Sequence, residues 1–175
     1  MDAVHFIVDS ALAFVVYAFL LRLLLPLVRA DFRNPLSQAI LKLTNWLVLP
    51  LRRLLPPIGR VDTASVVALL AVQFAAVLIL YRLLSDAPFL FPALARAALI
   101  SLALATIMLY TVLIFVYALL SFIAPGSYNP ATALLASLCE PVLRPIRRIL
   151  PALGGIDFSP LVALVGLQAL RLLIT

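Results

Sequence analysis

Two pairs of adjacent arginines are the residues of this sequence best suited to bind a charged group. Arg52-Arg53 and Arg147-Arg148 occur in the same local pattern, Pro-x-Arg-Arg. A guanidinium group presents a planar fork of N–H donors that matches the oxygens of a phosphate or a carboxylate. Two roles remain open for each pair. It holds its segment on one side of a membrane and contacts lipid phosphates, or it forms a docking face for a partner or a specific anionic lipid.

An aspartate follows each arginine pair at the same spacing. Asp62 and Asp157 each precede an apolar stretch, and Gly59 and Gly154 lie three residues before them. An aspartate at this position predicts a helix N-cap, which also interacts favourably with the helix dipole. The alternative is a carboxylate that pairs with the nearby arginines. Each glycine predicts the turn that redirects the chain into the next helix.

Two glutamines occur at matching positions inside apolar stretches. Gln73 and Gln168 each lie eleven residues beyond the preceding aspartate, which is about 16 Å along a helix and so near mid-membrane. An amide group in lipid requires a hydrogen-bonding partner. The first interpretation is an interhelical contact that holds the bundle or a dimer together. The second is the lining of a pore or substrate path.

The few nucleophiles and metal ligands argue against an enzyme. The chain has one histidine, His5, and one cysteine, Cys139. Neither has the partners that nucleophilic catalysis or a metal site requires, and one cysteine cannot form a disulfide within the chain. The sequence contains no phosphate-binding loop, zinc-protease motif or nucleophile elbow. We therefore expect no enzymatic activity, no metal and no cofactor.

The composition indicates that lipid surrounds much of the chain. Hydrophobic residues make up 66% of the 175 residues and charged residues 11%, against about 45–50% and about 25% in soluble domains. Four apolar stretches predict membrane-spanning helices, at about residues 4–27, 63–81, 97–123 and 158–175. Each is expected to be helical, because a segment in lipid must satisfy its own backbone hydrogen bonds. The net charge of +6 is expected to face anionic headgroups and not nucleic acid.

The sequence contains one unit twice. A shift of 95 residues aligns residues 34–80 with residues 129–175 without a gap, and sixteen of the 47 aligned pairs are identical. The identities include Asn-Pro, Arg-Arg, Pro, Gly, Asp and Gln in the same order, which an apolar composition alone would not align. We predict a first repeat at residues 1–85 and a second at residues 92–175. Each repeat contains two spans, so both repeats would enter the membrane in the same orientation.

The segment between the two spans of each repeat is amphipathic. On a helical wheel, residues 34–55 divide into a polar and an apolar face, and residues 129–150 do the same. Helices of this kind lie in the membrane interface. The predicted fold is therefore an all-α membrane protein with four transmembrane helices in two parallel repeats. Each repeat has an amphipathic interfacial helix on the cytoplasmic side, between its two spans.

Local signals mark where these two segments begin and bend. Asn34 and Asn129 are predicted N-caps, and each is followed by a proline at the first helical position. Pro50 and Pro145 precede the arginine pairs. Because proline removes a backbone donor and clashes with the preceding turn, we expect both helices to kink or break there.

The distribution of positive charge predicts the orientation. The connection between the repeats has only Arg82 and Arg96, whereas the connections within the repeats hold most of the basic residues: Arg29, Arg33, Lys42, Arg52, Arg53 and Arg60 in the first, and Arg144, Arg147 and Arg148 in the second. Basic residues favour the cytoplasmic side. We therefore expect a multi-pass protein of the bacterial inner membrane, with the repeat connections in the cytoplasm and both termini outside.

Four motifs carry a resemblance to a known family: RADFRNP at residues 29–35, PLRRLLPPIGRVD at 50–62, EPVLRPIRR at 140–148 and LPALGGIDFSP at 150–160. The chain resembles the YggT family of small bacterial inner-membrane proteins, in its two-repeat form, over nearly its whole length. The resemblance implies no established enzymatic activity. Family members are associated with cytochrome biogenesis in chloroplasts, with division or nucleoid organisation and with tolerance of osmotic stress. A direct haem role has little support, because His5 is the single histidine.

These observations favour a non-enzymatic scaffold or assembly factor of the cell-envelope, division or cytochrome-biogenesis type. Its basic interfacial helices would dock partner proteins or anionic lipids. The expected partners are a bilayer with anionic headgroups, an unidentified membrane protein and further copies of this chain. The alternative is an oligomeric channel or transporter component linked to osmotic or ion tolerance, in which Gln73 and Gln168 line the path.

Overall fold

The computed structural model describes residues 3–59, 61–85, 88, 90–123, 129–150 and 157–175. Within this part of the chain the structure is helical, apart from one isolated β-bridge between Ile58 and Val61. The prediction of an all-α chain is confirmed. Six helices follow one another in the described residues: α1 (Ala3–Leu27), α2 (Pro35–Leu54), α3 (Thr63–Leu84), α4 (Phe91–Ile123), α5 (Pro130–Ile149) and α6 (Ser159–Ile174).

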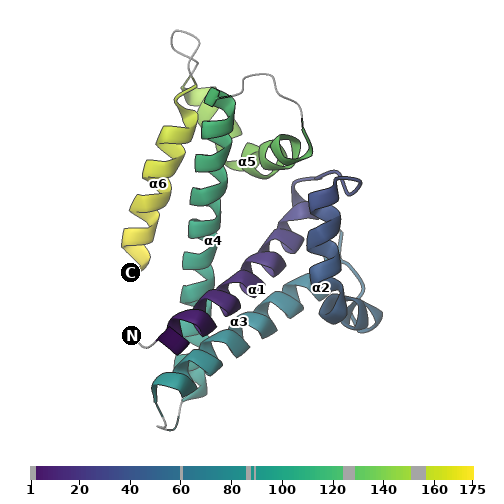
Figure 1. Cartoon of the computed structure of the whole chain (residues 1–175), viewed down its shortest axis with the longest axis vertical. Helices are drawn as coiled ribbons and strands as arrows, with labels where there is room; N and C mark the ends of the chain where they lie inside the picture. The colour runs from purple at the N-terminus through teal and green to yellow at the C-terminus, as the bar shows by residue number, and fades with distance from the viewer. Residues whose placement is uncertain (1–2, 60, 86–87, 89, 124–128, 151–156) are drawn as a thin grey trace.

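The helices form two groups of three (Figure 1). In the first group α1 packs beside α3, and in the second α4 packs beside α6. The helices α2 and α5 lie against these pairs, on the side of the molecule opposite the two chain ends. The groups meet where α4 contacts α1 and α3, and where α2 contacts α5. The two basic connections therefore touch near the starts of α2 and α5.

Three helices, α1, α3 and α4, are long and apolar enough to cross a membrane. They coincide with the first three predicted spans, although α4 begins earlier and has 33 residues. The helix α6 is apolar but has only 16 residues. At 1.5 Å per residue it is about 24 Å long, which is shorter than a hydrocarbon core of about 30 Å. A fourth span at α6 stays a prediction.

Large apolar side chains are exposed on the long helices. Phe14 of α1 is 62% exposed, Phe115 of α4 is 52% exposed and Leu173 of α6 is 84% exposed. In water such side chains would favour aggregation. Lipid tails are as apolar as these side chains, so a bilayer accommodates them without cost.

A small apolar cluster joins the two groups of helices. Leu25 and Ala30, at the end of α1 and in the turn that follows, pack against Leu134 and Leu138 of α5. All four side chains are buried. The end of the first long helix is thereby fixed to the connection of the second half.

The helices α2 and α5 do not end at their prolines. Helical structure continues through Pro50 to Leu54 and through Pro145 to Ile149. Of the kink or break predicted before each arginine pair, the break is therefore wrong, and the kink stays a prediction. A proline removes one backbone donor and crowds the preceding turn, which can bend a helix while later residues keep their own hydrogen bonds. As a result both arginine pairs lie in the last helical turn, where cations interact favourably with the helix dipole.

Candidate functional site

An ion pair fastens the end of α2 to the start of α3. Arg52, in the last turn of α2, pairs with Asp62, which immediately precedes α3. Asp62 occupies the N-cap position, but its side chain makes no capping hydrogen bond to the helix backbone. It instead accepts a hydrogen bond of 2.8 Å from the Ser65 hydroxyl. Of the two roles predicted for Asp62, the structure shows the arginine partner.

The surroundings of Asp62 favour its ionised form. Burial alone would raise the pKa of this carboxyl. The hydrogen bonds from Arg52 and Ser65, with the positive charges of Arg52 and Arg22, outweigh burial and hold the pKa of Asp62 below its ordinary 3.8. The ion pair is therefore intact at neutral pH.

A second arginine, Arg22 of α1, joins this ion pair from inside the protein. It is only 3% exposed. Its Nε donates to Ser65 Oγ at 3.2 Å, and its Nη1 donates to Thr44 Oγ1 at 2.9 Å and to Asn45 Oδ1 at 2.7 Å. The backbone carbonyl of Leu41 accepts a further bond of 3.2 Å. We call this group, which links α1, α2 and α3, the first cluster: Arg22, Thr44, Asn45, Arg52, Asp62 and Ser65.

Arg22 is not among the residues that the sequence predicts to form a site. A helix that is apolar on all sides carries no pattern that tells which face is buried. The signal that could have identified it is a basic residue inside an otherwise apolar stretch. Charged residues in membrane helices are rare and usually face a protein interior with a partner.

Arg147 is the centre of a second cluster, formed by α4, α5 and the start of α6. Its Nε donates to Asp157 Oδ2 at 2.8 Å, its Nη1 to Glu140 Oε2 at 3.1 Å and its Nη2 to the Tyr117 hydroxyl at 3.4 Å. Asp157 Oδ1 also accepts the backbone N–H of Ser159 at 2.9 Å. This aspartate therefore both caps a backbone donor and pairs with an arginine. We call Tyr117, Glu140, Arg147, Asp157 and Ser159 the second cluster.

Both ionised groups at the centre of the second cluster are stabilised. Burial would lower the pKa of Arg147, but its hydrogen bonds with Asp157 and Tyr117 outweigh burial and raise that pKa. Burial would raise the pKa of Asp157, but the hydrogen bonds from Ser159 and Arg147 bring it below 3.8. The pair therefore carries opposite charges at neutral pH.

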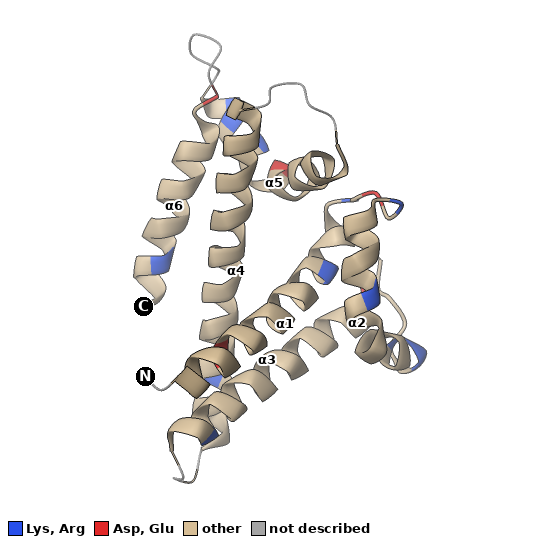
Figure 2. Ribbon diagram, viewed as in Figure 1, with Lys and Arg blue, Asp and Glu red and all other residues tan. Residues whose placement is uncertain are grey.

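The second arginine of each pair has a different environment. Arg53 and Arg148 are exposed, and no ion pair within the described residues involves either of them. The apolar residues that follow, Leu54 and Ile149, are 78% and 80% exposed. Figure 2 shows basic residues on α2, in the turn before it and near the end of α5. Within each pair, the first arginine is engaged in an ion pair within the protein, and no ion pair in the described residues engages its exposed neighbour.

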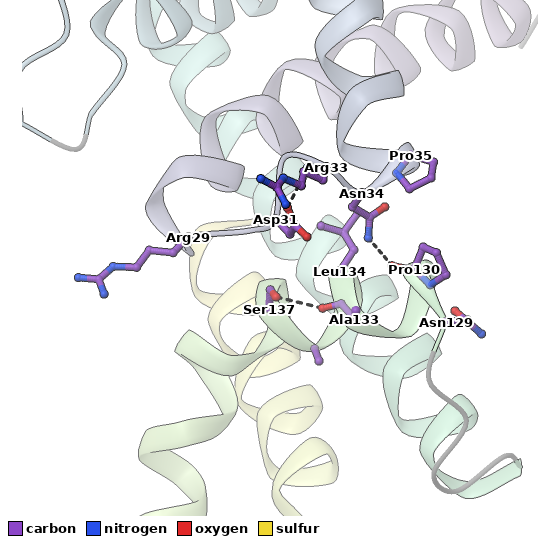
Figure 3. A pocket seen from close by; sticks show the side chains of 11 residues that line it. Arg29, Asp31, Arg33, Asn34, Pro35, Asn129, Pro130, Ala133, Leu134 and Ser137 are labelled. Carbon is purple, nitrogen blue, oxygen red and sulfur yellow. Dashed lines mark hydrogen bonds between the residues drawn. The ribbon is translucent and has the colours of Figure 1, made fainter.

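The two asparagines cap their helices, and one of them also joins the connections. Asn34 Oδ1 accepts the backbone N–H of Leu36 at 2.9 Å. Asn129 and Thr132 form a reciprocal capping box at the start of α5. The Asn34 amide nitrogen also donates to the carbonyl oxygen of Pro130 (Figure 3). The starts of α2 and α5 are thus tied together by a direct hydrogen bond.

A pocket of about 610 Å³ lies beside this contact. The turn before α2 contributes Arg29, Asp31 and Arg33, and the first turns of α5 form the other wall (Figure 3). Asp31 accepts the backbone N–H of Arg33 at 2.8 Å, which shapes the turn. Both arginines are exposed. Two exposed basic residues therefore lie at the edge of this pocket, with the Arg29 side chain extending away from it (Figure 3).

The turn before α3 contains the glycine that the sequence indicates. Gly59 has a φ of +62°, a left-handed conformation that glycine adopts without steric cost. Ile58 and Val61 pair across this turn. Gly154 lies outside the described residues.

Both predicted intramembrane glutamines hydrogen-bond to α4. Gln73 of α3 is 5% exposed, and its Nε2 donates to the Ser101 hydroxyl. Gln168 of α6 is exposed, and its Nε2 donates to Thr111 Oγ1 at 3.5 Å. These are interhelical contacts of the kind that the first interpretation requires. Gln73 makes the closer and more buried one.

Within the described residues no group of three or more His, Cys, Asp or Glu side chains could hold a metal ion. Cys139 is buried in α5, and burial raises the pKa of its thiol to about 12. A thiol with this pKa stays protonated at neutral pH and is a poor nucleophile.

The long apolar helices, with charged clusters at their ends, define the class of this protein as a small helical membrane protein. The model of the CCB3/YggT family matches residues 1–83 and residues 96–175. The chain therefore belongs to the CCB3/YggT family.

Relatives in several bacteria match most of the chain. The uncharacterized protein PA0392 of Pseudomonas aeruginosa is 39% identical over 157 residues, which are 89% of this chain and 79% of the relative. The uncharacterized protein YggT of Escherichia coli is 33% identical over 172 residues, which are 98% and 89% of the two chains. A Vibrio alginolyticus protein, described as an uncharacterized protein in the proC 3' region, is 34% identical over 169 residues, or 96% and 91%. No solved structure matches the chain.

Proposed function

We propose that this protein is a non-enzymatic scaffold or assembly factor of the bacterial inner membrane. It docks partner proteins or anionic lipids through its two basic connections. One observation carries the proposal: an exposed arginine beside an exposed apolar residue ends both α2 and α5. These are Arg53-Leu54 and Arg148-Ile149. A basic side chain next to an apolar one suits a helix end at the membrane surface, where the charge meets a headgroup or a partner.

The proposed membrane arrangement has α2 and α5 as interfacial helices between two pairs of spans, with α6 as the fourth span. Trp46 of α2 is 67% exposed, which suits an aromatic side chain at headgroup level. The excess of basic residues in the two connections supports a cytoplasmic location for them and external termini. Labelling of single cysteines from each side of the membrane tests this topology. Labelling of a cysteine in α2 from the outside would contradict it.

The two clusters divide the four candidate arginines into two kinds. Arg52 and Arg147 are engaged with Asp62 and Asp157, so they hold the ends of the connections in place. Docking is then assigned mainly to Arg53 and Arg148. Substitution of the first kind should disturb the fold, and substitution of the second kind should disturb binding alone.

The test is crosslinking in living cells, followed by purification in mild detergent and mass spectrometry of the captured proteins and lipids. The wild type is compared with a double variant, Arg53→Gln with Arg148→Gln. The control is Arg96→Gln, which removes an exposed arginine outside both connections. We expect the double variant to lose captured molecules that the control retains. An unchanged set of captured molecules in a correctly inserted double variant would reject the proposal.

The alternative is an oligomeric channel or transporter component. Its supporting observation is a mostly apolar pocket between α1, α3 and α4 whose lining includes the buried Gln73. Flux of ions and small osmolytes into proteoliposomes tests it, with Gln73→Leu as the variant. Absence of flux in the wild type under several gradients would exclude this function.

A further inference from the structure

The two groups of helices have the same internal packing. In each group the first helix packs beside the third, and the middle helix contacts both. Residues 95 positions apart occupy matching places within the groups. Phe19 of α1 and Ile114 of α4 are both buried, and so are Thr44 of α2 and Cys139 of α5. The shift of 95 residues therefore relates α1 to α4 as well, although the aligned stretch begins at residue 34.

The second group meets the first through one face of α4. Leu109 belongs to an apolar cluster formed mainly by α1, α2 and α3, and Leu102 and Ala105 pack against that cluster. These residues are three or four positions apart along the chain, so they lie on one side of the helix. Ser101 lies on the same side and accepts a hydrogen bond from Gln73 of α3. We call Ser101, Leu102, Ala105 and Leu109 the α4 face.

The matching face of α1 is uncovered. Subtracting 95 from each residue number of the α4 face gives Phe6, Ile7, Ser10 and Phe14. All four are exposed, and the three apolar residues are 66%, 64% and 62% exposed. We call these four residues the α1 face. Within the described part of the chain, no helix covers this face as the first group covers the α4 face.

The third helices of the two groups differ in the same way. The side of α3 that contacts α4 carries Gln73, and this glutamine is buried. Its counterpart on α6, Gln168, remains exposed despite its bond of 3.5 Å to Thr111. Val165 and Leu172, which line an open pocket with Gln168, are exposed as well. We call Val165, Gln168 and Leu172 the α6 face, which corresponds to the side by which α3 holds α4.

The connections show the same difference. Leu134 and Leu138 of α5 are buried against the end of α1 and the turn that follows it. Their counterparts on α2, Ala39 and Leu43, are exposed. Both sides of the joint between the groups therefore occur a second time, uncovered. The second group presents the surface by which the first group binds it, and the first group presents the surface that the second group offers.

We infer that copies of this protein associate head to tail in the membrane, with the α6 face of one copy packed against the α1 face of the next. The second group of one copy then contacts the first group of the next copy, as the two groups contact each other within one chain. Because the two contacting surfaces differ, every copy in such a contact still presents one of them to a further copy. Contacts of this kind build rings or open chains of subunits.

Polar side chains on both faces favour a protein partner over lipid. Gln168 lies on the α6 face and Ser10 on the α1 face, and amides and hydroxyls in membrane helices form hydrogen bonds between helices. Within the chain the equivalent glutamine, Gln73, bonds to Ser101. Ser101 corresponds to Phe6, and Ser10 lies about one turn from Phe6 on the same side of α1. We expect Ser10 to supply the hydroxyl that Ser101 supplies within the chain.

The first test is oxidative crosslinking of the full chain in native membranes. The background variant is Cys139→Thr, which introduces the residue found at the matching position, Thr44. Phe6→Cys and Gln168→Cys are introduced into this background separately and together. The control combines Gln168→Cys with Leu99→Cys, because Leu99 is exposed on α4 outside the α4 face.

The chain with both Phe6→Cys and Gln168→Cys should give a ladder of dimers and larger species. The two single variants expressed together should give a dimer and nothing larger, whereas each alone and the control should stay monomeric. An absent ladder, or an equally strong ladder in the control, would overturn the inference. Dimers of Gln168→Cys alone would show that α6 meets α6, which also contradicts the head-to-tail contact.

Ser10→Trp tests the same contact without crosslinks. Lipid accommodates a large ring, but the ring over-packs a contact between helices. We expect the fraction of oligomers released from membranes, measured by native mass spectrometry, to fall about tenfold. Leu99→Trp is the matched control and should keep the oligomers. A monomeric wild type, or an unchanged oligomer fraction in Ser10→Trp, would reject the inference.

The head-to-tail contact does not rest on the proposed docking function, since neither face includes an arginine of the connections. In the cysteine background, the double variant Arg53→Gln with Arg148→Gln should give the same ladder. A missing ladder in the otherwise unchanged chain would overturn the contact alone. An unchanged set of captured molecules in the double variant would reject the docking function alone.

Discussion

In the first cluster Asp62 interacts with two arginines, Arg52 directly and Arg22 through Ser65. In the second cluster the single arginine, Arg147, interacts with two carboxylates, Asp157 and Glu140. Two arginines and one aspartate have a formal charge of +1, and one arginine with two carboxylates has a formal charge of −1. The same arginine–aspartate pair thus has surroundings of opposite sign in the two halves.

Two sequence differences produce this contrast. Extending the shift of 95 residues aligns Arg22 with Tyr117 and Asn45 with Glu140. The first half therefore has a buried arginine where the second has a tyrosine, and a neutral amide where the second has a carboxylate. Burial differs as well, since Asp62 has an 11% exposed side chain and that of Asp157 is 39% exposed. We conclude that the first cluster is built on a buried arginine and a nearly buried aspartate that hold helices together, while the aspartate of the second cluster is more accessible.

The largest effect is expected from Arg22→Met, which keeps an apolar side chain of similar length in α1. The variant leaves acceptors on Thr44, Asn45 and Ser65 without their donor, and each unpaired buried group costs about 1–3 kcal/mol. We expect the free energy of unfolding to fall by about 3 kcal/mol. Titration with a denaturing detergent measures it. Arg22→Lys is the control and should show an intermediate loss of stability. An Arg22→Met variant as stable as the wild type would show that the first cluster does not hold the helices together.

A smaller effect is expected from the aspartates, and it should differ between the clusters. Asp62→Asn removes the carboxylate that pairs with Arg52 and lies next to the buried Arg22, which should cost about 2–3 kcal/mol. Asp157→Asn breaks a partly exposed pair and leaves Glu140 beside Arg147, so it should cost about 1 kcal/mol or less. The same detergent titration compares them. Equal losses would contradict the difference in burial on which the comparison rests.

The acid dependence of stability should follow the same two carboxylates. Both have a pKa below 3.8 in the folded protein. Their contribution is therefore complete above the pKa of the unfolded state and is lost as pH falls through the lowered folded values. We expect a fall in stability below about pH 4. Asp62→Asn should flatten this fall more than Asp157→Asn, as measured by thermal unfolding across the acid range. Identical acid profiles in both variants would show that the clusters do not differ in this respect.

The sequence predicted those parts of the molecule that depend on local signals. The apolar stretches predicted the positions of α1, α3 and α4, and the Asn-Pro motifs predicted the caps at Asn34 and Asn129. The recurrence of Asp after Arg-Arg pointed to an ion pair as one of two alternatives. All of these follow from neighbouring residues or from a repeated spacing.

The sequence could not predict contacts that depend on how helices face one another. Arg22 meets Ser65 only because α1 packs beside α3, and an apolar helix does not show its buried face in its sequence. Which of the two arginines, Arg52 or Arg53, forms the ion pair with Asp62 likewise depends on the path of the turn at Gly59. The sequence also left open whether Pro50 kinks or breaks its helix, because proline's effect on a helix depends on the surrounding contacts.

The smallest effect is expected at Tyr117, the counterpart of Arg22, and it gives the finest test of the comparison. The Tyr117 hydroxyl accepts a long bond of 3.4 Å from Arg147, whose guanidinium carbon lies 6.0 Å from the ring centroid. Tyr117→Phe removes the bond but keeps the ring, so we expect a loss of about 0.5 kcal/mol or less. Tyr117→Leu removes both and should cost about 1 kcal/mol.

A double-mutant cycle between Tyr117→Phe and Arg147→Gln measures the coupling directly. Arg22 and Tyr117 occupy the same position of the two repeats. A small coupling energy would show that this position contributes strongly to stability in the first repeat and weakly in the second. A coupling energy as large as the loss of stability in Arg22→Met would mean that Tyr117 stabilises the second cluster as strongly as Arg22 stabilises the first. The two clusters would then contribute equally to stability, and the conclusion that the second cluster is the more accessible and weaker one would be wrong.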